Sequence, residues 1–235
     1  MDNFRSIAKQ IRELDMFDEV LLIAGVITEK QPGLDTLSDE QIKTLMWINT
    51  ILPESEDKEN QGHIIAEAML LGEENIKSVI NEISTLLRIE VEKIYVKIQK
   101  EPAILLLASS HVKQVYNYLQ SIGLDSGQIR EVFFEAVQLD EKSLKDRCDI
   151  ILKHWSIDDL MFLAKCHFFG NIRYYDVIEA VTTAINELGT RKAMEFFRSY
   201  VPFFVEYRSE DYRKMSCDIS SHEAALKAIE DYKNK

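Results

Sequence analysis

Residues 102–129 decide the fold, and they read PAILLLASSHVKQVYNYLQSIGLDSGQI. From His111 to Gln120 the apolar residues recur at the spacing of one helical face. Gly123 follows, where a helix can close with a residue in the left-handed conformation. Leu124 and Asp125 then lead into a second helix. The stretch therefore predicts a helical hairpin with its turn at Gly123.

The same layout recurs further along the chain. An amphipathic stretch from Leu144 to Lys153 precedes Ser156-Ile157-Asp158-Asp159 and another apolar run. Aligned by pattern, the chain gives units of about 35–38 residues at 75–110, 111–145 and 146–183, a usual length for helical repeats. The units match in pattern and not in identity. They predict an all-α fold, an array of stacked helical hairpins that is α-solenoid-like.

Composition agrees with a helical protein. With 8 Gly and 4 Pro in 235 residues, the chain has little material for hairpin turns between strands. Residues 89–98 are rich in β-branched side chains, so a strand competes there; helix is favoured because no partner strand is evident nearby. Ser38 and Gln41 have the spacing of a capping box. Helices are predicted near 2–14, from Asp15 or Asp18 through Ala24, after Ser38, and near 63–71, 74–87, 90–100, 110–121, 125–137, 140–153, 156–168, 171–187, 189–200 and 224–232. Gly170 and Ser220 are expected as helix caps, and an aromatic segment is expected at 203–215.

The most loop-like segment runs from Pro53 to Gly62 and suggests an internal boundary. It predicts an acidic N-terminal helical region over residues 1–60 and a helical-repeat domain over 61–235, which ends in an aromatic segment. One continuous domain is the alternative.

The stretch from Pro102 to Ile129 resembles the repeat of the mitochondrial transcription termination factor family. In that family Pro-x-x-Leu-Leu precedes a helix, a Gly at the turn and a second helix. The resemblance covers about 70 residues, and its second unit has Ala136-Val137-Gln138-Leu139 where the proline and leucines would recur. The family is basic and binds duplex nucleic acid, whereas this chain has a net charge of −12. The resemblance implies stacked helical hairpins, and no functional residue is carried over.

The negative charge is concentrated at the N-terminal end. Residues 1–75 hold 6 basic and 16 acidic residues, a balance of −10, and the remaining 160 residues hold 22 and 24, a balance of −2. An acidic surface disfavours nonspecific phosphate binding and suits a basic partner.

The compartment is predicted to be the cytoplasm. Cys148, Cys166 and Cys217 have no paired spacing, which indicates a reducing compartment. The N-terminus shows no secretory signal, and no apolar run approaches the roughly 18 residues that span a bilayer. A membrane protein is therefore not expected.

Motifs that carry chemistry are missing from the sequence. It contains neither GxxxxGK[ST] nor GxGxxG. His63 and Glu67 could share a helix face, but two ligands are too few for a metal site. Cys166 and His167 are adjacent, so on a helix they point in different directions and do not form a catalytic pair. The sequence thus predicts a non-enzyme without cofactor or metal.

The segment from Arg191 to Lys214 interleaves cations with aromatic side chains, a pattern that can stack bases or grip a peptide. The alternative is that the aromatics form a C-terminal core with the arginines outside it. The candidate binding residues are Arg191, Lys192, Arg198, Tyr200, Tyr207, Arg208 and Arg213.

Two functions follow from these patterns. The first is a non-catalytic helical-repeat interaction or regulatory protein that binds a protein partner, with the aromatic segment as a second docking site or the seam of a homo-oligomer. The alternative is a nucleic-acid-binding regulator that uses the repeat surface and the segment 191–214.

Overall fold

The structure, a computed structural model, describes residues 2–15, 18–52, 57–165, 177–200 and 222–234. All regular structure in these ranges is helical, which confirms the predicted all-α class. The β-branched segment 89–98 lies mostly in helix α6, Val91–Lys100, so the preference for helix over strand is also confirmed. Ile94 and Ile98 of this helix are buried, because they lie one turn apart on its inner face.

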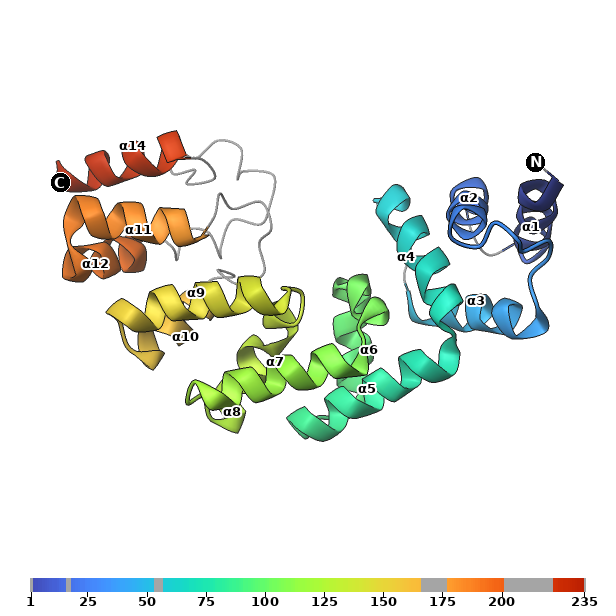
Figure 1. Cartoon of the computed structure of the whole chain (residues 1–235), viewed down its shortest axis with the longest axis horizontal. Helices are drawn as coiled ribbons and strands as arrows, with labels where there is room; N and C mark the ends of the chain where they lie inside the picture. Colours follow the sequence, from blue (N-terminus) through green and yellow to red (C-terminus); the bar gives the residue numbers. More distant parts are fainter. Residues whose placement is uncertain (1, 16–17, 53–56, 166–176, 201–221, 235) are drawn as a thin grey trace. The chain divides into compact units, whose positions relative to one another are not determined.

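The chain divides into two compact units, Met1–Lys113 and Gln114–Lys235, and the helices of each are coloured in chain order in Figure 1. The boundary falls inside α7, Ser109–Ser121. The predicted division at residue 60 falls inside the first unit, where α2 and α3 both pack on α4. The other helices of the first unit are α1 Asp2–Glu13, α2 Val20–Lys30, α3 Asp39–Ile51, α4 Lys58–Leu71, α5 Glu73–Leu87, α6 and the 3-10 helix η1 Pro102–Leu106.

In the first unit, α2 packs against both α1 and α4 (Figure 1). Gly62 of α4 lets α2 and α4 approach closely, since a Cβ added there would lie 2.7 Å from Cδ2 of Leu22 and 3.2 Å from Cβ of Glu19. Ion pairs between Lys58 and Asp18 (2.5 Å) and between Lys30 and Glu67 (2.7 Å) join the two helices on either side of this contact. The fully buried aliphatic side chains of this unit include Ile7, Ile11, Ile23, Ile27, Leu45, Ile48 and Ile83.

The second unit contains the remaining helices. α9 packs on α10 and α11 packs on α12, and contacts also join α8 to α10 and α9 to α11. Phe133, Phe196 and Phe197 are fully buried and supply its largest core side chains. The helices are α8 Ser126–Ala136, α9 Glu141–His154, α10 Ile157–Lys165, α11 Val177–Leu188, α12 Thr190–Tyr200 and α14 His222–Lys233.

Helix ends are set by local side chains. Ser38 and Gln41 form the predicted capping box at the start of α3, and Asp125 and Gln128 form a second one at α8. Gly123 has a φ of +97°, which confirms the left-handed turn of the central hairpin. The expected aromatic segment 203–215 and the expected caps at Gly170 and Ser220 lie outside the described residues. Among the described helices, none has the length and apolar character needed to cross a membrane.

Candidate functional site

Helix α12 carries the described part of the predicted binding segment. Arg191 and Lys192 lie in its first turn and are exposed, and Arg191 pairs with Glu195 one turn later at 3.6 Å. Tyr200 is the last residue of the helix. The remaining predicted residues, Tyr207, Arg208 and Arg213, lie outside the described residues.

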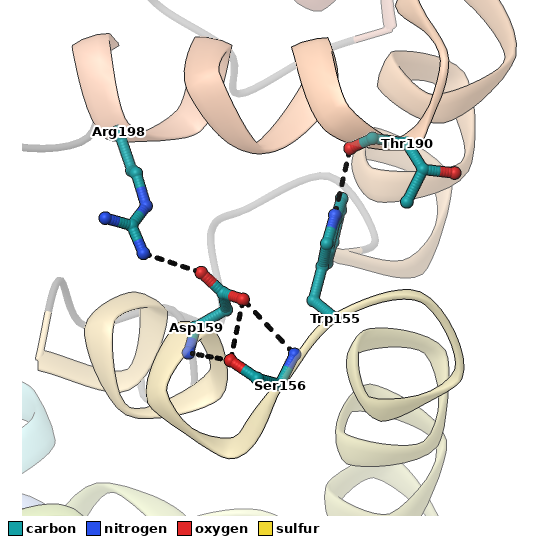
Figure 2. Close-up of polar contacts among 5 residues, drawn as sticks. All are labelled: Trp155, Ser156, Asp159, Thr190 and Arg198. Carbon is teal, nitrogen blue, oxygen red and sulfur yellow. Dashed lines mark hydrogen bonds and ion pairs between the residues drawn. The ribbon is translucent and has the colours of Figure 1, made fainter.

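Arg198 forms an ion pair within the fold. Its guanidinium donates to a carboxylate oxygen of Asp159 on α10 at 2.7 Å (Figure 2). The guanidinium also lies over the ring of Phe162, with 5.4 Å to the ring centroid. The Asp159 side chain is only 16% exposed, against 55% for Arg198. Arg198 therefore links α12 to α10 through its ion pair with Asp159.

Asp159 also closes the start of α10. Its second carboxylate oxygen accepts bonds from the Ser156 hydroxyl at 2.8 Å and from the Ser156 backbone N–H at 3.2 Å (Figure 2). The Asp159 N–H in turn donates to the Ser156 hydroxyl at 3.3 Å. Partial burial opposes ionisation, but the hydrogen bonds from Arg198 and Ser156 outweigh it and hold the pKa of Asp159 below its usual value.

Trp155 supplies the neighbouring contact. Its indole N–H donates to the backbone carbonyl of Thr190 at 2.9 Å, which joins the end of α9 to the start of α12 (Figure 2). The Trp155 ring packs edge-on against Phe197, with 6.1 Å between centroids. Phe196 packs in the same way on Tyr232 of α14 at 5.5 Å. The two phenylalanines of α12 thus belong to the core of the second unit, as the alternative interpretation of the aromatic pattern has it.

Trp155 and Asp159 were not predicted as partners of α12. The signal for the cap was present, because Ser156 and Asp159 have the Ser-x-x-Asp spacing of a helix start. No local pattern indicates the partners across the fold, since Thr190 and Arg198 lie 35 and 39 residues further along the chain.

Cys148 lies in the core between α7 and α9. Burial raises the pKa of its thiol to about 12, and the Tyr118 hydroxyl lies beside it. Burial also raises the pKa of Tyr118, whose hydroxyl donates to Asp149 at 3.5 Å. A thiol in this state is protonated at neutral pH and is a poor nucleophile.

His63 and Glu67 do not belong to a metal site in the described ranges. Glu67, the residue spaced to share a face with His63, has its carboxylate in an ion pair with Lys30. Within the residues that the structure describes, no group of three His, Cys, Asp or Glu side chains lies close enough to hold a metal ion.

A shallow pocket of about 250 Å³ lies in the first unit between α5 and the link from η1 to α7. Two of its polar groups are occupied by the fold: the Asn75 amide donates to the carbonyl of Leu71 at 2.6 Å, and the Ser109 hydroxyl donates to Glu82 at 3.1 Å. No acid–base pair converges on it. The pocket is lined by Leu71, Asn75, Ile76, Ser78, Val79, Leu105, Leu107, Ala108 and Ser109.

The first unit also has an acidic surface whose charge is only partly compensated. Residues 1–75 of this unit hold six cations, and three of them are used in ion pairs, Lys9 with Glu13, Lys30 with Glu67 and Lys58 with Asp18. Several exposed carboxylates form no ion pair with any residue that the structure describes. This acidic surface comprises Asp15, Glu29, Asp35, Asp39, Glu40, Glu59 and Glu74.

Comparison with known proteins was made at the level of families, sequences and structures. No protein-family model matches the chain, and neither a curated protein nor a solved structure matches it.

Proposed function

We propose that this chain is a non-catalytic helical-repeat interaction or regulatory protein, and that its first unit binds a basic protein partner. The observation that carries the proposal is the acidic surface defined above. Its carboxylates are exposed and form no ion pair among the described residues, so their field extends into solvent. Such a field accelerates encounter with a positively charged surface and selects against acidic partners.

The packing of the second unit supports the solenoid part of the proposal. In stacked hairpins each helix contacts its hairpin partner and also the equivalent helix of the next hairpin. The contacts α9–α10 and α11–α12 join the two helices of one hairpin, and the contacts α8–α10 and α9–α11 join equivalent helices of neighbouring hairpins. A cytoplasmic location is part of the same proposal, because the described cysteine, Cys148, is a buried free thiol.

Affinity capture with a charge-neutralised bait tests the proposal. The full chain and the variant Asp15→Asn/Glu29→Gln/Asp35→Asn are used to capture proteins from the native host. Asn suits the first position, since Asp15 has a φ of +52°. We expect the wild-type bait to retain a basic protein that salt elutes, and the variant to retain much less of it.

The control bait carries the same change of charge elsewhere. Asp158→Asn/Glu230→Gln/Asp231→Asn neutralises three exposed carboxylates of the second unit and is expected to retain the partner. Retention of the same proteins by the wild-type and first-unit variants would exclude the acidic surface as the binding site.

Nucleic-acid binding is the second candidate function, and the exposure of Arg191 and Lys192 on α12 favours it. Its weakness is that Arg198 is occupied by Asp159. Titration of fluorescent single- and double-stranded oligonucleotides at low salt tests it. Binding that falls steeply with salt and is lost in Arg191→Gln/Lys192→Gln would support it, and no binding of either oligonucleotide would exclude it.

A further inference from the structure

Helix α2 is more apolar than is usual for a helix on the surface of a protein. Its residues 20–28 read VLLIAGVIT and contain no charged side chain. A helix that is apolar all round is normally covered all round. α1 and α4 cover one side of α2, where Val20, Ile23, Ala24, Val26 and Ile27 are buried. On the opposite side Leu21 is exposed, and Gly25 and Thr28 are half-buried.

The surface of this opposite side is uneven. Leu21 is 57% exposed, and one turn later Gly25 leaves a notch, since a Cβ added there would meet no atom within 4 Å. Thr28 continues the same face, and its hydroxyl is already bonded to the carbonyls of Ala24 at 2.9 Å and Gly25 at 3.0 Å. We name these three residues, Leu21, Gly25 and Thr28, the α2 stripe. Their spacing of four and three residues places them on one face of the helix, the arrangement by which one helix packs on a second.

Both ends of the α2 stripe are acidic. Residues 15–30 contain four carboxylates, at Asp15, Asp18, Glu19 and Glu29. Asp18 is paired with Lys58 and Glu19 lies against Gly62 of α4, which leaves Asp15 and Glu29 as the exposed acids at the two ends. The single cation of this stretch is Lys30. That cation is neutralised by Glu67 in its ion pair. Glu29 is exposed and lies one turn beyond Gly25 on the same side of the helix.

We propose that the α2 stripe is the docking face for an amphipathic helix of the basic partner, an inference that rests on the proposed function. An apolar side chain of the partner helix enters the notch at Gly25 and packs beside Leu21. Lysine or arginine side chains of the partner lie at the two ends, near Asp15 and near Glu29.

Charge decides between this occupant and a second copy of the chain. Two copies that meet at α2 would bring together two chains of net charge −12 and place like charges at the ends of the contact. A basic helix meets the opposite sign at both ends and adds steering to apolar contact.

The test uses synthetic peptides of about five helical turns, with the full chain as the receptor. The probe peptide has Leu on one face, Ala at its centre and Lys at both ends. One comparison peptide is a scrambled sequence of the same composition, and another has Gln in place of Lys. Fluorescence anisotropy at low salt measures the dissociation constants. We expect the probe peptide to bind and both comparison peptides to bind at least about tenfold more weakly.

Two pairs of variants locate the site. Gly25→Gln fills the notch, while Gly33→Gln adds the same side chain at a loop glycine that is equally unobstructed. Leu21→Gln removes the exposed leucine, while Val96→Gln makes the matching change on α6, where Val96 is 53% exposed. We expect the first member of each pair to weaken binding of the probe peptide about tenfold or more, and the second to leave it unchanged. Melting temperatures of all four variants, equal to or above that of the wild type, confirm that the fold is intact.

The outcomes separate the two proposals. Equal binding of the probe and scrambled peptides, with no effect of Gly25→Gln or Leu21→Gln, overturns the docking face and leaves the acidic interaction surface standing. Equal binding of the probe and its Gln version, lost in Gly25→Gln, overturns the basic partner and leaves the docking face. Failure of every peptide to bind overturns both. Dimerisation in sedimentation equilibrium that Gly25→Gln abolishes makes a second copy the occupant and overturns the partner helix.

Discussion

Gly123 shows how one backbone conformation fixes a hairpin. Its φ of +97° lies in the region that side chains disfavour, and a Cβ added there would lie 3.1 Å from Cδ1 of Ile157. The residue therefore meets two separate demands, a left-handed turn after α7 and a close approach of α10. Only a residue without a side chain meets both.

The variant Gly123→Ala is expected to lower the free energy of unfolding by about 1–3 kcal/mol, because backbone strain and the contact with Ile157 add. Urea denaturation measures it. Gly33→Ala is the matched control, since Gly33 has open space around it, and a change within about 0.5 kcal/mol is expected there. Equal effects of the two substitutions would contradict the account of Gly123.

Asp159 makes stability depend on pH. Its pKa is lowered in the folded state, so its contribution is present above the unfolded pKa of about 4 and is lost as pH falls through the folded pKa. We expect Asp159→Asn to cost about 1–2 kcal/mol at neutral pH and distinctly less at about pH 3. Urea denaturation at the two pH values measures the difference.

The neighbouring Asp158 provides the control for this experiment. It is exposed and also lies in the first turn of α10, so Asp158→Asn removes the same charge from the same helix end without the bond to Arg198. A cost below about 1 kcal/mol is expected. A penalty for Asp159→Asn that stays constant down to low pH would argue against an ionised Asp159 in the fold.

At the scale of elements, helices were predictable where the signal is local. The capping box of Ser38 and Gln41 indicates helix α3, which the structure contains. The periodic apolar residues of α5 and α7 likewise indicate helices that the structure contains. The 3-10 helix η1 was not predicted, because the apolar run after Pro102 has no periodicity that separates it from other structure. Contacts between helices were not predictable, since they depend on which faces meet.

The contact between α2 and α4 gives a prediction at this scale. Gly62→Ala places a Cβ against Leu22 and Glu19 and is expected to destabilise the first unit by about 1–2 kcal/mol, despite the better helix propensity of Ala. Gly25→Ala on the facing helix meets no atom and is expected to stabilise by about 0.5–1 kcal/mol. Thermal and urea denaturation of the pair measure both signs, and the same sign in both variants would refute the close approach at Gly62.

At the scale of the whole molecule, each unit contains one tryptophan, Trp47 in the first and Trp155 in the second. Trp47 lies near Lys77, 5.5 Å from its ammonium, and Trp155 packs on Phe197. The two fluorophores can therefore report the unfolding of the two units separately when the other is replaced by Phe.

We expect Gly62→Ala to lower the urea midpoint reported by Trp47 by about 0.5–1 M, and to leave the midpoint reported by Trp155 nearly unchanged. Each comparison is made within its own background, Trp155→Phe for the first unit and Trp47→Phe for the second. Equal shifts of both midpoints would mean that the two units unfold as a single cooperative body.

The sequence by itself determined the helical class, most helix positions, the turn at Gly123 and the acidic character of the N-terminal end, because these depend on spacing, caps and composition within a few residues. Tertiary structure alone decided that Arg198 is bound by Asp159, that Phe196 and Phe197 are core, and that Leu21 of α2 is exposed. The physical reason is distance along the chain. The partners of Trp155 and Asp159 lie 35 and 39 residues further along the chain. No local sequence pattern indicates which of such distant residues will contact a given side chain.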